Sequence, residues 1–238
     1  MSAGLRRFMK RAFLFIGIIL TTISAFAQNE AELVNKVKAK LDKVNDYKAE
    51  GIMSIDVPFI KAAPSAVAIY YKKPSEFRIK KEGGISILPK GGLNINISTI
   101  LSMGKYTVVP SGEAKTAGVK TKVVKLVPED ETTSVILATL FIDETNLVIR
   151  KSIVTTRENG TYEMEMNYGK YSNWGLPDKV IFSFNTKDYK LPKGVTFEYE
   201  SGEKKSKPTT TENKKGKVEI NYSSYSINKG IPDSVFKD

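Results

Sequence analysis

The sequence predicts a mainly β domain with one N-terminal helix, and two periodicities in the 238-residue chain carry this prediction. Near the start, apolar residues recur every three or four positions over one segment, which is the spacing of a helix with one buried face. Beyond that segment they recur at every second position in many short runs, as in antiparallel strands with one buried face. Such a sheet must curl and cover its apolar side.

The first 27 residues have the layout of a secretory signal peptide. Four basic residues precede an apolar run from Ala12 to about Ile23, and Ala25-Phe26-Ala27 places small residues where a signal peptidase reads. The apolar run is too short for a membrane span, which needs ~20 residues. We therefore expect cleavage before Gln28 and one mature, soluble domain at residues 28–238. Because Gln28 is not a cysteine, it cannot carry a lipid anchor.

The predicted helix spans residues 30–46. Its apolar residues fall on one face, and they are Leu33, Val34, Val37, Leu41 and Val44. Lysines occupy the other sides, at positions 36, 38, 40 and 43. Glu30 and Glu32 lie near the positive end of the helix dipole, and Asn45-Asp46 end the segment. A two-sided helix of this kind is expected to lay its apolar face on the sheet.

Roughly ten antiparallel strands are predicted after the helix. In the first, residues 47–57, Met53 and Ile55 face one side with other apolar residues, and Pro58 ends the run. The others are expected near residues 66–72, 76–81, 105–109, 120–127, 134–142, 147–157, 161–170, 180–184, 195–199 and 218–222. Asn159-Gly160 predicts a hairpin turn of the type that tolerates positive φ at both central residues.

Two stretches do not follow this alternation. In residues 83–103, the apolar residues fit a short strand or a second small helix equally well, and they are Ile95, Ile97, Ile100 and Leu101. Residues 202–216 are rich in Lys, Thr and Pro, and they predict a polar, solvated hairpin loop.

The charge balance disfavours nucleic acid as a partner. The chain has 37 basic and 26 acidic residues, a net charge of +11, and loss of the four basic signal-peptide residues lowers it to +7 (11 minus 4). Only Arg78, Arg150 and Arg157 would remain as arginines, and lysine lacks the planar fork with which arginine reads phosphates and bases. A mildly basic surface suits an anionic membrane surface or an acidic protein, and it equally fits a surface that is merely soluble.

The residue types leave little room for catalysis. The chain has no histidine and no cysteine, which excludes His-based triads, thiol nucleophiles and zinc sites built on imidazole or thiolate. Glu163 and Glu165 share a strand face, but it is opposite to that of Met164 and Met166 and is expected to face solvent. The acidic run 129–131 predicts a solvated turn more readily than a cation site. We therefore predict a binding protein without enzymatic activity, cofactor or metal.

The apolar faces carry methionine and aromatic residues besides valine and leucine. Methionine adapts its shape to variable partners, so Met53, Met164 and Met166 suit a cavity that receives different acyl chains. The same residue types fit an ordinary filled core equally well.

Four segments carry a family resemblance. The first, LVNKVKAKLDKVNDYKAEG (33–51), is an amphipathic helix, an aromatic residue and a first strand. The second, IYYKKPSEFRI (69–79), is a strand and hairpin with a basic residue before proline, and the third, LFID (140–143), precedes a turn. The fourth, YSSYSINKGIPDSVF (222–236), is a closing strand with an Asn-x-x-Ile-x-x-x-x-Phe segment. Taken in this order, the segments resemble the LolA family.

The resemblance implies an unclosed antiparallel β-barrel of about eleven strands covered by a helical lid. It implies a periplasmic carrier, in a double-membraned bacterium, that holds lipoprotein acyl chains in an apolar cavity and ferries them towards the outer membrane. The implied partners are acylated lipoproteins, an inner-membrane lipoprotein-releasing transporter and an outer-membrane acceptor, with the carrier as a monomer.

The cavity and lid expected in this chain combine the helix stripe with inward-facing strand residues. They are Val34, Val37, Leu41, Val44, Met53, Ile55, Phe77, Met164, Met166, Phe182 and Phe184. In the family, an arginine before the proline of the second hairpin bonds to the lid and keeps it shut. Here that position is Lys73, followed by Pro74. Lysine lacks arginine's several fixed donors, so the resemblance leaves the latch role of Lys73 open.

Two other functions fit the same fold. One is a lipid-sensing regulatory protein of the envelope, and the other is a structural module that binds no lipid. Carriage requires that the apolar faces of helix and sheet enclose room for a guest, so a solidly packed interior would count against it.

Overall fold

The computed structural model describes residues 29–57, 60–61, 63–81, 97–102, 104–158, 160–185 and 215–237. Within these ranges, one antiparallel sheet has the strand order β4-β3-β1-β11-β10-β9-β8-β7-β6-β5, and β2 pairs with β1 outside this order. The strands are β1 (Asp46–Val57), β2 (Ile60–Lys61), β3 (Ser65–Lys72), β4 (Glu76–Lys81), β5 (Tyr106–Thr116), β6 (Val119–Pro128), β7 (Val135–Asp143), β8 (Val148–Thr156), β9 (Gly160–Asn167), β10 (Lys179–Asn185) and β11 (Lys215–Ile227). The mainly β fold is confirmed.

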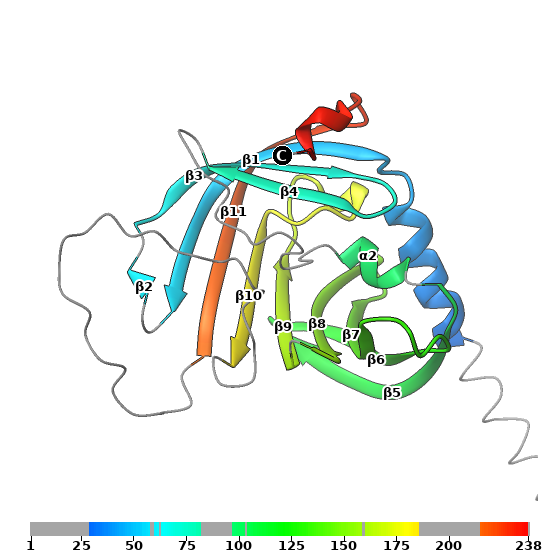
Figure 1. Ribbon diagram of the computed structural model, residues 1–238. Helices are drawn as coiled ribbons and strands as arrows, with labels where there is room; N and C mark the ends of the chain where they lie inside the picture. Colours follow the sequence, from blue (N-terminus) through cyan, green and yellow to red (C-terminus); the bar gives the residue numbers. More distant parts are fainter. Residues whose placement is uncertain are drawn as a thin grey trace, which may run out of the picture.

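The sheet does not close into a barrel. Its edge strands are β4 and β5, and within the described residues they do not pair with each other. Figure 1 shows the sheet bent around its concave side, with β1, β3 and β4 on one side of the opening and β5 to β8 on the other. The antiparallel half-barrel implied by the family resemblance is therefore confirmed.

The N-terminal helix covers residues 29–41 and runs across the opening between these two sides (Figure 1). It ends at residue 41 rather than near Asp46 as predicted, because its last turn tightens. The N–H of Lys43 bonds to the carbonyl of Lys40 at 3.3 Å and that of Val44 to Leu41 at 3.0 Å, which is the shorter three-residue step. β1 then begins at Asp46.

Strand alternation decides which side chains face the concave side. In β1, Ala49 and Met53 are buried, whereas Lys48, Glu50 and Ile52 between and beside them are exposed. β9 and β10 repeat the pattern. The buried residues of these strands join one core cluster, so the apolar alternation read from the sequence marks the concave face.

The stretch that the sequence left open contains a short helix, α2 (Ile97–Leu101). Ile100 and Leu101 are buried in the same core cluster as the N-terminal helix. α2 is therefore a second helical cover of the concave face, and the helical alternative for this stretch is correct.

Several predictions lie outside the described residues. These are the signal peptide, Ile95, Asn159, the strand at 195–199 and most of the polar loop at 202–216. Because β11 begins at Lys215, the last two residues of that predicted loop belong to a strand instead. No helix in the described part of the chain is long and apolar enough to cross a membrane.

Candidate functional site

The N-terminal helix lies with its apolar stripe against the concave face of the sheet. Val34 is 0% exposed, Val37 1% and Val44 2%. With Leu33 and Leu41 they form one cluster with the inward-facing strand residues. Since burial of a Val or Leu side chain contributes about 1.5–3 kcal/mol, this stripe is the main attraction between helix and sheet.

The structure brings together all eleven residues predicted for the cavity and lid. Nine are buried in the cluster, namely Val34, Val37, Leu41, Val44, Met53, Met164, Met166, Phe182 and Phe184. Ile55 and Phe77 are partly buried and pack against it. Their convergence is a structural fact, and lipid binding by them stays a prediction.

Several inward-facing side chains under the helix are shielded from solvent. Leu140, Val154 and Met164 are 0% exposed, so none of them borders a space that admits water. The rings of Tyr162 and Phe182 lie 5.1 Å apart between their centroids. A guest therefore reaches these side chains only if the helix or another cover moves.

One polar group sits among these apolar side chains. Ser152 on β8 pairs in register with Leu140 on β7 and Met164 on β9, and it is 0% exposed. Its hydroxyl has no hydrogen-bond partner in the described structure, although most buried polar atoms have one. Sequence reasoning missed Ser152 because a serine within a strand gives no signal of its own.

Lys73 lies in the turn between β3 and β4 and contacts the end of the N-terminal helix. Its ammonium donates to the backbone carbonyl of Asp42 and lies 3.5 Å from the Asp42 carboxylate. Its backbone N–H donates to the carbonyl of Asn45 at 2.9 Å. A cation at this end of a helix also meets the negative end of the helix dipole. Lys73 thus touches the lid, and its role as a latch stays a prediction.

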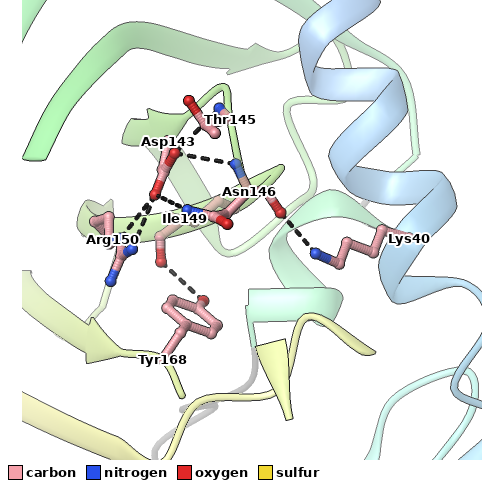
Figure 2. Close-up of polar contacts among 7 residues, drawn as sticks. All are labelled: Lys40, Asp143, Thr145, Asn146, Ile149, Arg150 and Tyr168. Carbon is pink, nitrogen blue, oxygen red and sulfur yellow. Dashed lines mark hydrogen bonds and ion pairs between the residues drawn. The ribbon is translucent and has the colours of Figure 1, made fainter. Parts of the chain in front are cut away.

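A second polar contact joins the helix to the turn between β7 and β8. Lys40 Nζ donates to the backbone carbonyl of Asn146 at 2.6 Å (Figure 2). Desolvation and the nearby charge of Lys43 lower the pKa of Lys40, and Asp143 opposes this effect. Sequence reasoning missed the contact because its acceptor is a backbone atom, which no side-chain pattern reveals.

Asp143 holds the turn that presents this carbonyl (Figure 2). Its Oδ1 accepts the backbone N–H groups of Thr145 and Asn146, both at 3.1 Å. Its Oδ2 accepts the side-chain amide of Asn146 at 2.9 Å and the Arg150 guanidinium at 2.9 and 3.2 Å. Burial raises the pKa of Asp143, but these hydrogen bonds and the Arg150 charge outweigh it, so the pKa lies below its usual value.

The same turn is braced from β8. Arg150 lies over the ring of Tyr168, 5.5 Å from its centroid, and the Tyr168 hydroxyl donates to the carbonyl of Ile149 at 2.9 Å (Figure 2). Leu147 has a φ of 50°, a left-handed conformation that is uncommon outside glycine. So many contacts fix one shape of the turn and one position of the Asn146 carbonyl.

The segment after the helix is fixed by the C-terminal part of the chain. Asn228 Nδ2 donates to the carbonyl of Lys43 at 2.8 Å, and Oδ1 accepts the N–H of Asn45 at 2.7 Å. Gly175 packs on Leu41 so closely that a Cβ there would lie 2.8 Å from Leu41 Cδ2. The C-terminal end of the helix is therefore held from several directions.

Comparison with known proteins finds matches among solved structures only. No family model and no curated protein sequence matches the chain. Among solved structures, a Vibrio parahaemolyticus domain named for outer membrane lipoprotein sorting has a TM-score of 0.58 at 10% identity. A LolA superfamily protein from Nitrosomonas europaea and a DUF1329 family protein from Desulfovibrio piger each have 0.54 at 11%. Each match covers 89% of this chain and 97% of the other. The chain has the LolA-like fold.

The remaining candidate sites of this LolA-like half-barrel carry ordinary surface contacts. Glu163 and Glu165 face away from the core, as predicted, with Lys151 Nζ at 2.7 and 3.9 Å from their carboxylates. In the acidic run 129–131, Asp130 accepts the backbone N–H of Thr132 at 2.8 Å within a turn. Within the described ranges, no group of three or more His, Cys, Asp or Glu residues could hold a metal ion.

Proposed function

We propose that this protein carries the acyl chains of lipoproteins through the bacterial periplasm towards the outer membrane and catalyses no reaction. The observation that supports this function is the placement of the lid. An amphipathic helix lies with its apolar stripe against the inner face of an unclosed apolar half-barrel, and polar side chains clasp it at one end. The structural likeness to a domain named for lipoprotein sorting supports the same function.

The energetics of acyl burial suit a carrier. Each buried CH₂ contributes about 0.8 kcal/mol relative to water, so a protein that covers several acyl chains holds them firmly during passage through an aqueous space. Exchange with a membrane replaces one apolar environment by another and is nearly neutral. A small bias at either membrane is then enough to load or unload the carrier.

Burial of the apolar stripe against the sheet is the resting state in this proposal. Side chains such as Val34 and Met164 are buried in one apolar cluster while no cargo is bound. Loading separates the helix from the sheet and replaces these contacts with contacts to acyl chains. Methionines at positions 53, 164 and 166 suit this exchange because their unbranched side chains adapt to irregular partners.

The setting of the protein belongs to the same proposal. Residues 1–27 would direct export and be removed, leaving residues 28–238 as one domain and a monomer in the periplasm. An inner-membrane lipoprotein-releasing transporter would load it, and an outer-membrane acceptor would unload it.

Two measurements on the exported, purified protein test this function. The first extracts it with organic solvent and identifies lipids by mass spectrometry, and the second titrates it with a fluorescent synthetic tripalmitoyl-cysteinyl peptide. Binding of the peptide and recovery of acylated lipoproteins in a pull-down are expected. Binding of free lipid without the lipopeptide would favour a sensor instead. If neither lipid nor peptide binds, the result would favour a structural module that binds no lipid.

A lid variant and its control locate the binding site. Val37→Glu places a carboxylate in the apolar contact between helix and sheet, and we expect it to abolish lipopeptide binding because a buried unpaired charge is costly. Lys38→Glu changes the charge of the adjacent, less buried position and should bind normally. Circular dichroism verifies that both variants fold.

A cross-linking experiment tests the same site without disturbing the fold. Photoreactive methionine is incorporated in place of Met53, Met164 and Met166, and the bound lipopeptide is cross-linked by light. Cross-links to the acyl chains at these positions are expected. Binding without any cross-link at them would move the cargo away from the concave face.

A further inference from the structure

The polar contacts of the N-terminal helix are concentrated at one of its ends. Lys40 bonds to Asn146 and Lys73 bonds to Asp42. Asn228 bonds to both Lys43 and Asn45, at 2.8 and 2.7 Å. Every one of these contacts falls within residues 40–46, and they come from three separate places in the fold: the β7–β8 turn, the β3–β4 turn and the segment after β11.

The close packing of this end adds a constraint that does not depend on charge. Gly175 follows the 3₁₀ turn Ser172–Trp174 and touches Leu41 where no Cβ would fit. Asp46 accepts the N–H groups of Lys229 and Gly230 at 3.1 and 3.0 Å. Residues 40–46 are therefore tied to segments that are distant in sequence.

The N-terminal part of the helix has a different kind of contact. Leu33, Val34 and Val37 are buried against the core. The ion pair between Glu32 and Lys36, at 2.8 Å, stays within the helix and both side chains are more than half exposed. Among the described residues, no hydrogen bond joins positions 29–39 to the sheet through a side chain. The buried Oε2 of Glu30 has no hydrogen-bond partner there either.

We propose that cargo enters beneath the N-terminal part of this helix, residues 29–39, which lifts away from the sheet while residues 40–46 stay in place as the hinge. This inference rests on the proposed carrier function and adds the place of entry. Apolar contacts have no fixed direction, so acyl chains can replace the sheet as the partner of Leu33, Val34 and Val37. The hydrogen bonds at residues 40–46 have no such substitute in an acyl chain and are expected to persist. In this proposal Lys73 therefore holds the hinge and does not act as a latch that releases.

Distance measurements between spin labels test the hinge directly. The chain has no cysteine, so cysteines introduced at chosen exposed positions are the only sites that a thiol-reactive spin label modifies. One pair joins Lys36→Cys to Asn167→Cys on β9, and the matched pair joins Lys43→Cys to Asn167→Cys. With the synthetic tripalmitoyl-cysteinyl peptide, we expect the first distance to lengthen by roughly 5 Å, about half a helix diameter. The second distance should stay the same.

The possible results separate the inference from the function on which it rests. If the peptide binds and both distances lengthen, the lid detaches as a whole and the hinge is wrong. If it binds and neither distance changes, entry lies elsewhere and the hinge is equally wrong. If it does not bind to the unlabelled protein, the carrier function itself fails.

Hydrogen exchange of the cargo-free protein provides a test that needs no ligand. The backbone amides of residues 33–39 are expected to exchange faster than those of Val44 and Asn45, which donate to the Leu41 carbonyl and to Asn228 Oδ1. Equal exchange over the two groups would overturn the hinge. Lys40→Met should speed exchange at residues 42–45, and Lys38→Met, without a described side-chain contact, is its control.

Discussion

Among single residues, Ser152 gives the most direct test of how the interior is packed. Its hydroxyl is buried without a partner between Leu140 and Met164, and an unpaired buried hydroxyl costs about 1–3 kcal/mol. We expect Ser152→Ala to leave the free energy of unfolding unchanged or raise it by up to about 2 kcal/mol, because it removes the hydroxyl and little volume. Urea unfolding measures the difference.

Thr121→Val is the matched control for Ser152→Ala. Thr121 is 1% exposed, but its hydroxyl donates to the carbonyl of Ala114 at 3.1 Å. Removing a satisfied hydroxyl should lower the free energy of unfolding by about 1 kcal/mol. If Ser152→Ala destabilises the protein as much as Thr121→Val does, the Ser152 hydroxyl has a partner after all.

Single residues also show how far the sequence alone could locate the candidate site. Val34 and Val37 were predicted to face the sheet because helical spacing determines which side chains share a face, and both are buried. Lys73 was singled out through a family resemblance, since nothing in its own spacing points to Asp42. The bond from Lys40 to Asn146 has a backbone acceptor, and the position of that carbonyl depends on how Asp143 folds the turn. Only the three-dimensional structure could therefore reveal this bond.

At the scale of elements, the β5–β6 hairpin contains a turn that its sequence does not optimise. Ala117 and Gly118 form the turn with φ of 47° and 82°, and positive φ at both central residues favours Asn-Gly. An alanine in this conformation is strained by about 1 kcal/mol. Ala117 is exposed, so Ala117→Asn should raise the free energy of unfolding by about 0.5–1 kcal/mol. Thermal unfolding should show a higher midpoint.

The neighbouring glycine provides the opposite substitution. Gly118→Ala introduces a Cβ at positive φ, and we expect it to lower the midpoint by an amount similar to the gain from Ala117→Asn. Equal midpoints for the wild type and both variants would mean that this edge hairpin unfolds before the rest of the molecule.

The β10–β11 pair should contribute to stability in a pH-dependent way. Glu219 on β11 bonds to Lys179 at 2.7 Å and to Asn221 at 3.0 Å, and these bonds, that of Lys179 first, lower its pKa from 4.5 to about 2. A carboxyl with a lower pKa in the folded state stabilises the fold above its unfolded pKa, and the contribution is lost as the pH falls towards the folded pKa. The window therefore runs from about 4.5 down to about 2.

Glu219→Gln tests this window. The free energy of unfolding, measured in urea at several pH values, should fall less steeply below about pH 4.5 in the variant than in the wild type. Between about pH 6 and 7 the two curves should run parallel, because the carboxyl is fully ionised there in both the folded and the unfolded state. Identical slopes in the acid range would contradict the assignment.

The elements differ in how well their sequence patterns predicted them. The strands could be predicted because a long alternating run, such as that of β9 or β10, repeats the period of two several times. α2 has five residues, which is less than two helical turns, so its apolar residues fit either period. The early end of the N-terminal helix was missed because Val44 stays buried at a helical spacing even though the chain has already left the helix.

On the scale of the whole molecule, an open sheet with one apolar face requires a cover, and the helix and α2 supply it from outside the sheet. The half-barrel followed from the sequence because alternation and strand number leave few alternatives for a sheet of this size. The extent to which the concave face is shielded from solvent did not follow from the sequence. Residue types alone suit both a packed core and a cavity, and the two differ in distances between elements that no local pattern encodes.

Burial of the inward-facing side chains makes cargo uptake depend on opening of the lid in the proposed function. Side chains such as Leu140 and Met164 are 0% exposed, so we expect acyl chains to bind only to molecules whose lid is open. The apparent dissociation constant is then the intrinsic constant divided by the fraction of molecules that are open. The observed rate of binding should therefore rise with lipopeptide concentration and then level off at the opening rate. Stopped-flow fluorescence with the tripalmitoyl-cysteinyl peptide measures this limit.

Two valine truncations then distinguish opening at the N-terminal part of the helix from general loosening of the fold. Val34→Ala and Val44→Ala remove the same atoms from buried sites, 0% and 2% exposed, and both should lower the free energy of unfolding. Only Val34 lies on the part that lifts, so Val34→Ala should raise the limiting rate by up to about tenfold, as expected for loss of roughly 1.4 kcal/mol of contact. Val44→Ala should leave that rate near the wild-type value because the hydrogen bonds of Lys43 and Asn45 still hold the hinge. Equal acceleration by both variants would mean that overall stability, not the position of the hinge, controls uptake.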